Sequence, residues 1–376
     1  MLTNKNVKKT VFIVVGRLGK SLTISKSEPF TYNKRIDEVF IFRERAGFEL
    51  KGAKYITIPK SLLSIRPKII QRSVRIVFEF LQLLWYSFKY QPIIINGVGV
   101  KPKGWNSVIV SLITKSNSIF SLIGGTVSIT TYYKHKRFWK KLNLWFIRKS
   151  DIVTTKGNNM KTYLLEHKIK KEKIFLFNGS INTDKFKYND KIIKDIDILF
   201  VGDFSSLKGP DRVFEIVLDL IGTSEIKQAV FLGNGVLYPK IQDLITSHGV
   251  QKYITLKGYV EDPVIYFQRS KIIVIPSISE GLPTAMLEAM ACGCVPVVSN
   301  VGNITDAAKH GLNSYVVEDY QNTPLFANYC RDLLRDVRKR EMFANNGMDS
   351  VQKSYSISKQ SDIVDDMLDY LITLHK

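Results

Sequence analysis

The chain has 376 residues, of which 45% are hydrophobic and 11% aromatic, and its formal net charge at pH 7 is +21. Its length exceeds the roughly 250–300 residues at which a single core stops growing, and its apolar content excludes a disordered chain, so we expect two folded domains. The three cysteines, Cys292, Cys294 and Cys330, form neither a disulfide framework nor a metal-binding pattern, which indicates a reducing compartment.

The basic excess is confined to the first half of the chain. Residues 1–190 contain 36 Lys and Arg against 11 Asp and Glu, whereas residues 191–376 contain 19 against 23. This asymmetry predicts that the first half faces a membrane surface, an acidic substrate or nucleic acid. The alternative explanation is an AT-rich genome that favours lysine, but such a bias would affect both halves.

The beginning of the chain lacks the apolar region and small-residue cleavage site of a signal peptide. The longest apolar stretch, 76–88, is interrupted by Glu79 and Gln82 and is too short to span a bilayer. We therefore expect a cytoplasmic protein that can lie on a membrane without crossing it.

Short, continuous apolar runs alternate with helix-like stretches through the first half, a pattern typical of parallel sheets that are covered on both faces. The expected strands are 11–15, 39–42, 93–95, 119–123, 152–154 and 174–179, and the expected helices include 66–90 and 136–149. A polar linker at 180–195 follows, and then the alternation restarts. The later strands are expected at 196–201, 228–232, 253–256, 272–276, 295–299 and 314–317, with helices at 209–221, 236–248 and 283–291 before a long helical region.

The alternation predicts two doubly wound parallel-sheet domains, 1–185 and 186–355, facing a central cleft. A C-terminal helix, 356–376, is expected to pack back toward the first domain. Ligands of open parallel sheets bind beyond the carboxyl ends of the strands, so we expect the active site in the cleft.

Cations and aromatics are interleaved at 134–146 and, more loosely, at 66–90. Such helices can lie in a lipid interface, where each basic residue near an anionic surface contributes on the order of 1 kcal/mol. The alternative is a helix packed on its sheet with its other face in water. We expect an anionic membrane surface as a partner.

The strongest chemical signal is the segment 276–299, which predicts a strand end, a loop, a helix, a turn and a strand. Pro283 suits the start of the helix and Gly293 the residue just past its end. The loop Gly281-Leu282-Pro283-Thr284 places amides at a helix N-terminus, where the dipole and the unpaired N–H groups favour an anion.

Two carboxylates flank this loop. Glu280 has the reach to contact sugar hydroxyls, and Glu288 has the reach to accept from ribose hydroxyls. The pattern of a Glu, seven residues and a second Glu resembles the retaining glycosyltransferases of family four, the group 1 glycosyltransferases. An amphipathic helix with two solvent-facing glutamates is the alternative explanation. The resemblance implies the GT-B fold, with two Rossmann-like domains, and a UDP- or GDP-sugar donor.

Three further stretches resemble this family in the same order. The strand and loop 200–209 contain Lys208, and the family's Lys at this place reaches the donor pyrophosphate. The turn with Gly233 and Gly235 follows the next strand, where bulky side chains would block the nucleotide. Donor contacts are also implied for Lys257, Gly258 and Tyr259.

The family mechanism retains the anomeric configuration and needs neither a metal nor a cofactor. The resemblance assigns the catalytic roles to Glu280 and Lys208, with Lys208 and the amides of 281–284 stabilising charge that develops on the phosphate. Asp195-Ile196-Asp197 matches the Asp-x-Asp pattern of a metal-binding motif. It opens a strand distant from this loop, and we interpret it as a solvated strand edge.

The sequence departs from the family at two places. Asp203 stands where many members carry an Arg that binds the pyrophosphate, and Arg212 and Lys257 are candidate substitutes. Many members also have a His at the end of a first-domain strand, where this chain has the stretch 122–125 without one. His135 is the nearest alternative.

On the acceptor side, Gly16, Arg17 and Gly19 stand where the family has a flexible Gly-rich loop; a plain turn is the alternative. The resemblance implies a retaining hexosyl transferase at the inner face of the membrane, with a lipid-linked glycan of surface polysaccharide synthesis as its acceptor. The rivals are a nucleotide-sugar epimerase on the same fold and a non-catalytic partner subunit, which Asp203 and the missing His favour. A nucleic-acid-binding protein ranks last because no recognised module is present.

Overall fold

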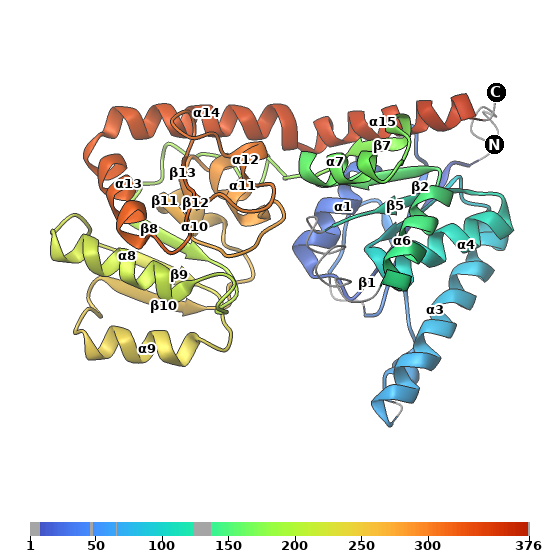
Figure 1. The fold of residues 1–376 in the computed structure, drawn as a ribbon, viewed down its shortest axis with the longest axis horizontal. Coiled ribbons are helices and arrows are strands. Elements are labelled where there is room, and N and C mark those ends of the chain that lie inside the picture. The colour runs from blue at the N-terminus through green and yellow to red at the C-terminus, as the bar shows by residue number, and fades with distance from the viewer. Residues whose placement is uncertain (1–7, 46–47, 65, 124–136, 375–376) are drawn as a thin grey trace. The chain divides into compact units, whose positions relative to one another are not determined.

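The computed structural model describes residues 8–45, 48–64, 66–123 and 137–374, which form two compact units (Figure 1). Unit 1 comprises Met1–Ser180 together with Ile357–Lys376, and unit 2 comprises Ile181–Ser356. Each unit is built on a parallel sheet, which confirms the predicted α/β architecture. Among the described residues, no helix has both the length and the apolar character that a bilayer crossing requires.

Unit 1 contains seven parallel strands in the order β3-β2-β1-β4-β5-β6-β7. Every residue of β1, β4, β5 and β6 is buried, because helices cover both faces of the sheet. The strands are β1 (Thr10–Gly16), β2 (Glu38–Arg43), β3 (Ala53–Thr57), β4 (Ile94–Val98), β5 (Asn117–Ser121), β6 (Ile152–Thr155) and β7 (Ile174–Leu176). The chain leaves β1 toward β2 on one side and reaches β4 on the other, so the switch point of this sheet lies between β1 and β4.

The helices of unit 1 include the last helix of the chain. Val364, Met367, Leu368 and Leu371 of α15 lie in the same buried cluster as Phe30 of α1. The C-terminal helix therefore completes the core of unit 1. The helices are α1 (Lys20–Tyr32), α2 (Lys60–Leu63), α3 (Lys68–Tyr90), α4 (Trp105–Thr114), α6 (Arg137–Lys149), α7 (Asn158–Glu166) and α15 (Ile357–Leu374), with a π-helical turn at Val100–Gly104 and a 3₁₀ turn at Lys171–Lys173.

Unit 2 contains six parallel strands in the order β10-β9-β8-β11-β12-β13, with its switch point between β8 and β11. The strands are β8 (Ile196–Val201), β9 (Ala229–Leu232), β10 (Ile254–Gly258), β11 (Ser270–Ile275), β12 (Val295–Ser299) and β13 (Tyr315–Val317). The helices are α8 (Pro210–Gly222), α9 (Tyr238–Ser247), α10 (Val264–Arg269), α11 (Thr284–Ala291), α12 (Ile304–Ala307), α13 (Thr323–Arg335) and α14 (Val337–Tyr355).

The interpretation of Asp195-Ile196-Asp197 as a solvated strand edge is wrong for Asp197. This residue lies on β8, a central strand, and is 3% exposed. Its carboxylate accepts hydrogen bonds from the amides of Lys227 (2.6 Å) and Gln228 (3.1 Å) and from the ammonium of Lys271 (2.6 Å). Asp197 therefore ties the start of β8 to the start of its two neighbouring strands.

A lysine is buried in the core of unit 1. Lys26 on α1 is fully buried, and its ammonium donates to the carbonyl of Phe177 and lies 4.6 Å from the centre of that ring. Burial lowers the pKa of Lys26 well below its ordinary value, and the charge of Lys156 lowers it further. The amine is therefore held in a setting that favours its neutral form.

We expect Lys26→Met to remove a pH dependence from the stability of unit 1. Because the folded-state pKa is lowered, the folded protein binds fewer protons than the unfolded chain between that pKa and the unfolded value of about 10.4. Stability of the unsubstituted protein should therefore rise with pH across this window.

Denaturant unfolding at a series of pH values measures the slope. The exposed Lys34→Met is the matched control and should keep the slope of the unsubstituted protein. Identical slopes for the Lys26→Met and Lys34→Met proteins would contradict a neutral Lys26.

Candidate functional site

Two charged side chains meet at the switch point of unit 2. Lys208 lies on the loop after β8 and Glu280 on the loop after β11, and the Nζ of Lys208 is 2.5 Å from Oε1 of Glu280. The hydroxyl of Ser277 donates to the same oxygen at 3.0 Å. The Glu280 side chain is 9% exposed and that of Lys208 is 33% exposed. The structure thus brings together the two residues predicted to be catalytic, with the lysine nearer the solvent.

Arg212 joins the two loops that carry this pair. From α8, its Nε donates to the carbonyl of Pro276 at 2.8 Å and its Nη2 donates to the carbonyl of Ser206 at 3.0 Å. A backbone hydrogen bond of 2.8 Å from Ile278 to Leu207 lies between the same loops. Arg212 was a candidate cation for the donor phosphate, but the structure shows its guanidinium engaged with protein carbonyls.

The loop that carries Glu280 is fixed from its other side by residues after β12. Ser299 donates from its hydroxyl to the carbonyl of Ser277 at 2.7 Å, and the amide of Asn303 donates to the carbonyl of Gly281 at 2.9 Å. Gly302 has φ +63°, and a Cβ at this position would lie 1.9 Å from the carbonyl oxygen of Glu280. Gly302 is a site residue that the sequence reasoning missed, and its only sequence signal is a glycine shortly after a buried strand.

The helix α11 begins one residue after Pro283, which is its N-cap. The amides of a first helical turn lack partners inside the helix, and the anion site predicted from the sequence at this end of α11 stays a prediction. Leu282 is buried at 4% exposure and anchors the loop in the core. Glu288 is half-buried and lies one turn beyond Thr284, on the same face of the helix.

The turn after β9 packs on the loop after β8. Gly233 and Gly235 have φ of +134° and +154°, and Cβ atoms there would lie 1.8 Å from the carbonyl oxygen of Gly202 and 2.8 Å from the amide nitrogen of Phe204. The two glycines are therefore needed by the protein's own backbone, which is a different reason from the predicted clearance for a nucleotide. Asp203 lies beside this turn, with Oδ1 2.9 Å from the position of a Cβ on Gly235.

The end of β10 adjoins the same turn. The carbonyl of Gly258 accepts from the amide of Gly233 at 2.7 Å, while Lys257 is exposed and Tyr259 is 76% exposed. The loops that follow four neighbouring strands of unit 2 thus gather the predicted donor residues at one edge of its sheet.

The predicted acceptor residues fall in unit 1. Gly16 ends β1 with φ +59°, and Arg17 donates to the carboxylate of Glu44. Gly19 is the N-cap of α1. His135 lies outside the residues that the structure describes.

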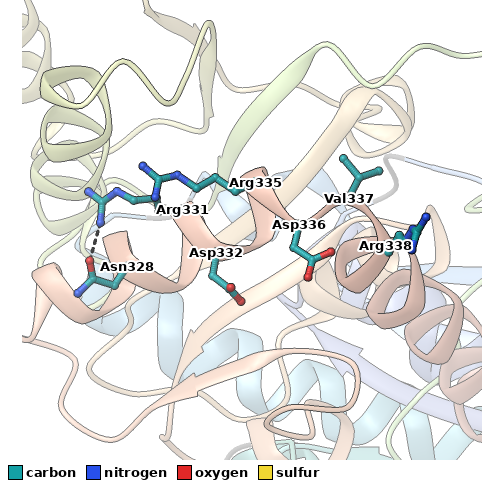
Figure 2. A pocket seen from close by; sticks show the side chains of 7 residues that line it. All are labelled: Asn328, Arg331, Asp332, Arg335, Asp336, Val337 and Arg338. Carbon is teal, nitrogen blue, oxygen red and sulfur yellow. Dashed lines mark hydrogen bonds between the residues drawn. The ribbon is translucent and has the colours of Figure 1, made fainter.

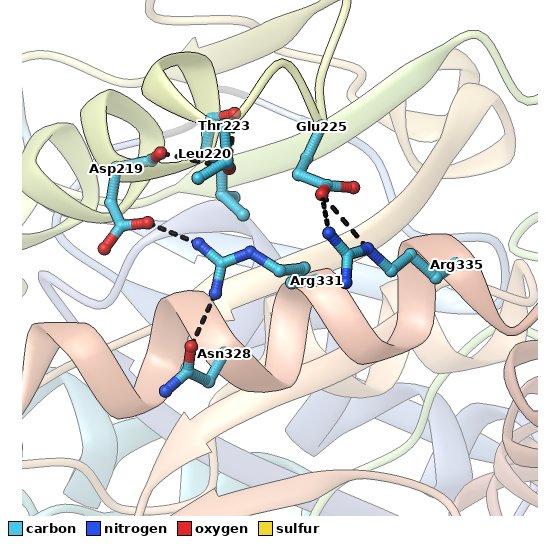
Figure 3. A network of polar contacts seen from close by, with 7 residues as sticks. All are labelled: Asp219, Leu220, Thr223, Glu225, Asn328, Arg331 and Arg335. Carbon is cyan, nitrogen blue, oxygen red and sulfur yellow. Dashed lines mark hydrogen bonds and ion pairs between the residues drawn. The ribbon is translucent and has the colours of Figure 1, made fainter.

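A separate hollow of about 610 Å³ is lined by residues of α13 and the start of α14, among them Arg331, Asp332 and Arg335 (Figure 2). It contains none of the predicted site residues. Two of its arginines pair with carboxylates elsewhere in unit 2, Arg331 with Asp219 at 2.5 Å and Arg335 with Glu225 (Figure 3). These ion pairs hold α13 against the α8 region, so we assign the hollow a structural role.

Residues 167–349 match the family model described as glycosyl transferases group 1. An uncharacterized glycosyltransferase of Methanocaldococcus jannaschii is 30% identical over 162 residues, which are 42% of this chain and 41% of the relative. The alpha-D-kanosaminyltransferase of Streptomyces kanamyceticus is 27% identical over 167 residues, which are 44% and 43% of the two chains. These alignments therefore span less than half the length of the curated relatives.

The fold extends over more of the chain than the sequence similarity does. The structure of Anabaena HepE in complex with UDP-glucose superimposes with a TM-score of 0.71 at 13% identity, covering 97% of this chain and 99% of that chain. The two parallel-sheet units thus have the GT-B fold, as predicted.

We expect Arg212→Ala to loosen the two loops that carry Lys208 and Glu280. Two hydrogen bonds from a charged donor are lost, so amide hydrogen exchange of Ile278 and its neighbours should accelerate by about tenfold or more. Exchange followed by mass spectrometry measures this. Arg331→Ala removes another partly buried arginine of unit 2, and it should leave these amides unchanged. Equal exchange in the two variants would show that Arg212 does not hold the loops.

Proposed function

We propose that the protein is a retaining, metal-independent glycosyltransferase that moves a hexose-type sugar from a UDP- or GDP-sugar to an acceptor. The observation that carries the proposal is the Lys208–Glu280 pair at the switch point of unit 2, beside the N-terminus of α11. The group 1 family match of residues 167–349 and the likeness to a fold with UDP-glucose bound in HepE support it.

The geometry of the pair suits different roles for Glu280 and Lys208. Glu280 is largely buried and fixed by Ser277, so its carboxylate can accept hydrogen bonds from the hydroxyls of the transferred sugar. Lys208 is more exposed, and rotation about its side-chain bonds would turn its ammonium from Glu280 toward a diphosphate. Its charge would stabilise the negative charge that develops on the leaving phosphate, together with the amides at the start of α11.

The remaining donor contacts follow from the same arrangement. Glu288 on α11 has the reach to accept from ribose hydroxyls, and the backbone of Lys257, Gly258 and Tyr259 lies beside the Gly233 turn where a base would sit. Arg212 acts indirectly as a positioning residue, because its donors are committed to the carbonyls that hold the two loops.

We expect Glu280→Gln to reduce sugar transfer on the order of a hundredfold or more, because a preorganised charged partner of the reacting sugar is lost. Affinity for UDP or GDP should change little, since Lys208 and the α11 amides remain. The assay is release of nucleotide diphosphate from a panel of nucleotide-sugars in the presence of a lipid-linked acceptor extract.

The exposed Glu341→Gln is the control and should retain full turnover. A thermal-shift titration tests folding and donor binding in parallel, since a nucleotide at 100 times its dissociation constant stabilises by about 2.7 kcal/mol. Turnover that survives unchanged in Glu280→Gln would falsify the assigned role. Nucleotide binding without any turnover in the unsubstituted protein would favour a non-catalytic partner subunit.

The proposed acceptor is a lipid-linked glycan intermediate of surface polysaccharide synthesis, used at the inner face of the membrane. The support comes from α3 of unit 1, whose amino-terminal half extends away from the sheet (Figure 1). Its exposed apolar side chains recur every three or four residues and form one stripe, which we name the α3 stripe. The stripe comprises Ile70, Val74, Val77, Leu81, Trp85 and Phe88, and Ile69 is exposed beside it.

The α3 stripe faces outward although the helix carries charged residues on its inner side. Arg75 and Glu79 are 15% and 17% exposed, whereas Leu81 is 54% exposed and Trp85 is 56% exposed. A contiguous exposed apolar surface of this kind marks a protein or membrane contact. The basic excess of unit 1 favours an anionic lipid surface as that partner.

The two segments predicted to contact a membrane differ in how much apolar surface they expose. In α6, Phe138 and Trp145 are exposed, but Leu144 and Phe146 are buried in unit 1. Residues 134–136 of the predicted segment lie outside the described residues. The α3 stripe therefore offers more apolar surface than α6, which reverses the order expected from the sequence.

We expect Leu81→Asp to weaken binding to anionic vesicles severalfold, because a carboxylate within the stripe opposes both apolar insertion and the lipid charge. Vesicle flotation with and without anionic lipid measures binding. Leu312→Asp in unit 2 is a matched control, since Leu312 is 53% exposed and Leu81 is 54% exposed. Equal flotation of the two variants would contradict a membrane role for the stripe.

A further inference from the structure

A second charged pocket lies in unit 1, at the carboxyl ends of β1 and β2. It has a volume of about 420 Å³ and is lined by Gly16, Arg17, Arg43, Glu44 and Arg45. The pocket thus lies at the carboxyl-end edge of the sheet, the edge at which open parallel sheets bind their ligands, and next to the switch point between β1 and β4.

The charges around this pocket do not balance. Glu44 is 6% exposed and accepts from Arg17 and, at 3.0 Å, from Arg75. Burial opposes ionisation of Glu44, but these arginines outweigh it and lower its pKa. Glu79 is the other carboxylate of the cluster, and its Oε1 lies 3.6 Å from Nε of Arg75. Glu44 is therefore occupied by Arg17 and Arg75, whereas Glu79 makes only the 3.6 Å contact, and burial raises the pKa of Glu79.

Three cations remain without an ion pair among the described residues. Lys103 lies directly behind the pocket, with Nζ 2.8 Å from the position of a Cβ on Gly16. Burial lowers the pKa of Lys103, although Glu79 opposes this shift. Arg45 is exposed at the pocket wall. Arg43, the third, lies between the pocket and the smaller cavity of about 20 Å³ next to it.

Arg43 is the residue whose chemistry points to a ligand. Its Nε and Nη1 are buried and have no hydrogen-bond partner among the described residues. Its remaining contacts are weak or apolar: a 3.5 Å hydrogen bond from Nη2 to the carbonyl of Leu18, and a position 4.4 Å over the ring of Phe48. A buried guanidinium with unsatisfied donors is costly, and its planar fork matches the oxygens of a phosphate.

We propose that this pocket, with Arg43 and Arg45 as its main ligands, binds a phosphate or pyrophosphate group of the acceptor. The anion meets the guanidinium of Arg43 where this residue lines the pocket, and it neutralises the surplus positive charge. That the anion belongs to the acceptor rests on the proposed function, whereas the anion site itself does not. The outward α3 stripe and the inward Arg75 and Glu79 belong to one helix, so the pocket lies behind the surface proposed to contact lipid.

Calorimetric titration of the full chain with inorganic phosphate tests the site. Saturating UDP is present throughout, so that the anion site at α11 of unit 2 is occupied. We expect Arg43→Gln and Arg45→Ala each to weaken phosphate binding by about tenfold or more, because each removes a charged donor. Arg45 is exposed, so its substitution leaves the core intact. Lys170→Ala removes an exposed cation of unit 1 outside the pocket and should leave phosphate affinity unchanged.

Equal phosphate affinity in the unsubstituted protein and the three variants would overturn the proposal that this pocket binds an anion. A separate measurement of UDP affinity distinguishes failure of the anion site from failure of the proposed function. If the unsubstituted protein does not bind UDP, the donor assignment fails, whereas the phosphate titration still tests the pocket. Vesicles containing phosphatidic acid distinguish the two sources of the group. If the phosphate is a lipid headgroup, free phosphate should compete with vesicle binding in the unsubstituted protein but not in Arg43→Gln. If it is a soluble compound, vesicle binding should be insensitive to free phosphate.

Discussion

The constraint on which the structure depends is the burial of parallel strands on both faces. Strands such as β1 and β12 are buried at every residue, so their side chains are fully used in packing. Functional side chains then stand at the carboxyl ends of the strands or on the loops beyond them, and the widest opening between such loops is at the switch point. Both units obey this rule. Lys208 and Glu280 follow β8 and β11 in unit 2, and Arg17 and Lys103 follow β1 and β4 in unit 1.

Loops at a sheet edge have little packing of their own, so polar contacts must fix them. In unit 2 this is done by Arg212, which donates to the carbonyls of two loops, and by Ser299, which donates to a third carbonyl beside Glu280. Gly302 allows the chain after β12 to come against the carbonyl of Glu280. The position of the Glu280 carboxylate thus depends on residues from two other connections of the sheet, neither of which needs to contact a substrate.

The sequence predicted those features whose cause is local. Residues 196–201 and 295–299 were predicted as strands and form β8 and β12 with these bounds, because short, largely apolar runs between polar segments have few alternatives. The α1 helix was missed because its buried face carries Thr23, Ser25 and Lys26, which conceal the apolar period.

The Glu280–Glu288 spacing and Lys208 could also be found in the sequence, as a motif. The bridging role of Arg212 could not, since its partners Pro276 and Ser206 are brought to it only by the pairing of β8 with β11. The interpretation of Asp197 was wrong for the same reason. Its hydrogen-bond partners lie at the starts of two neighbouring strands, and only strand pairing brings them to it.

The α3 helix shows how a single element can serve two partners. A helix on the surface of a water-soluble domain turns its apolar stripe inward, where burial of each large side chain contributes roughly 1.5–3 kcal/mol. In α3 the inner side packs Phe80, Leu83 and Leu84 into a buried cluster of unit 1. It also carries Arg75 and Glu79, while a second apolar stripe remains outside. The outer stripe is not buried by any described residue, and contact with an apolar medium would bury it. The lipid surface that we propose as partner would supply that medium, and it would also present phosphate groups to the arginines on the inner side.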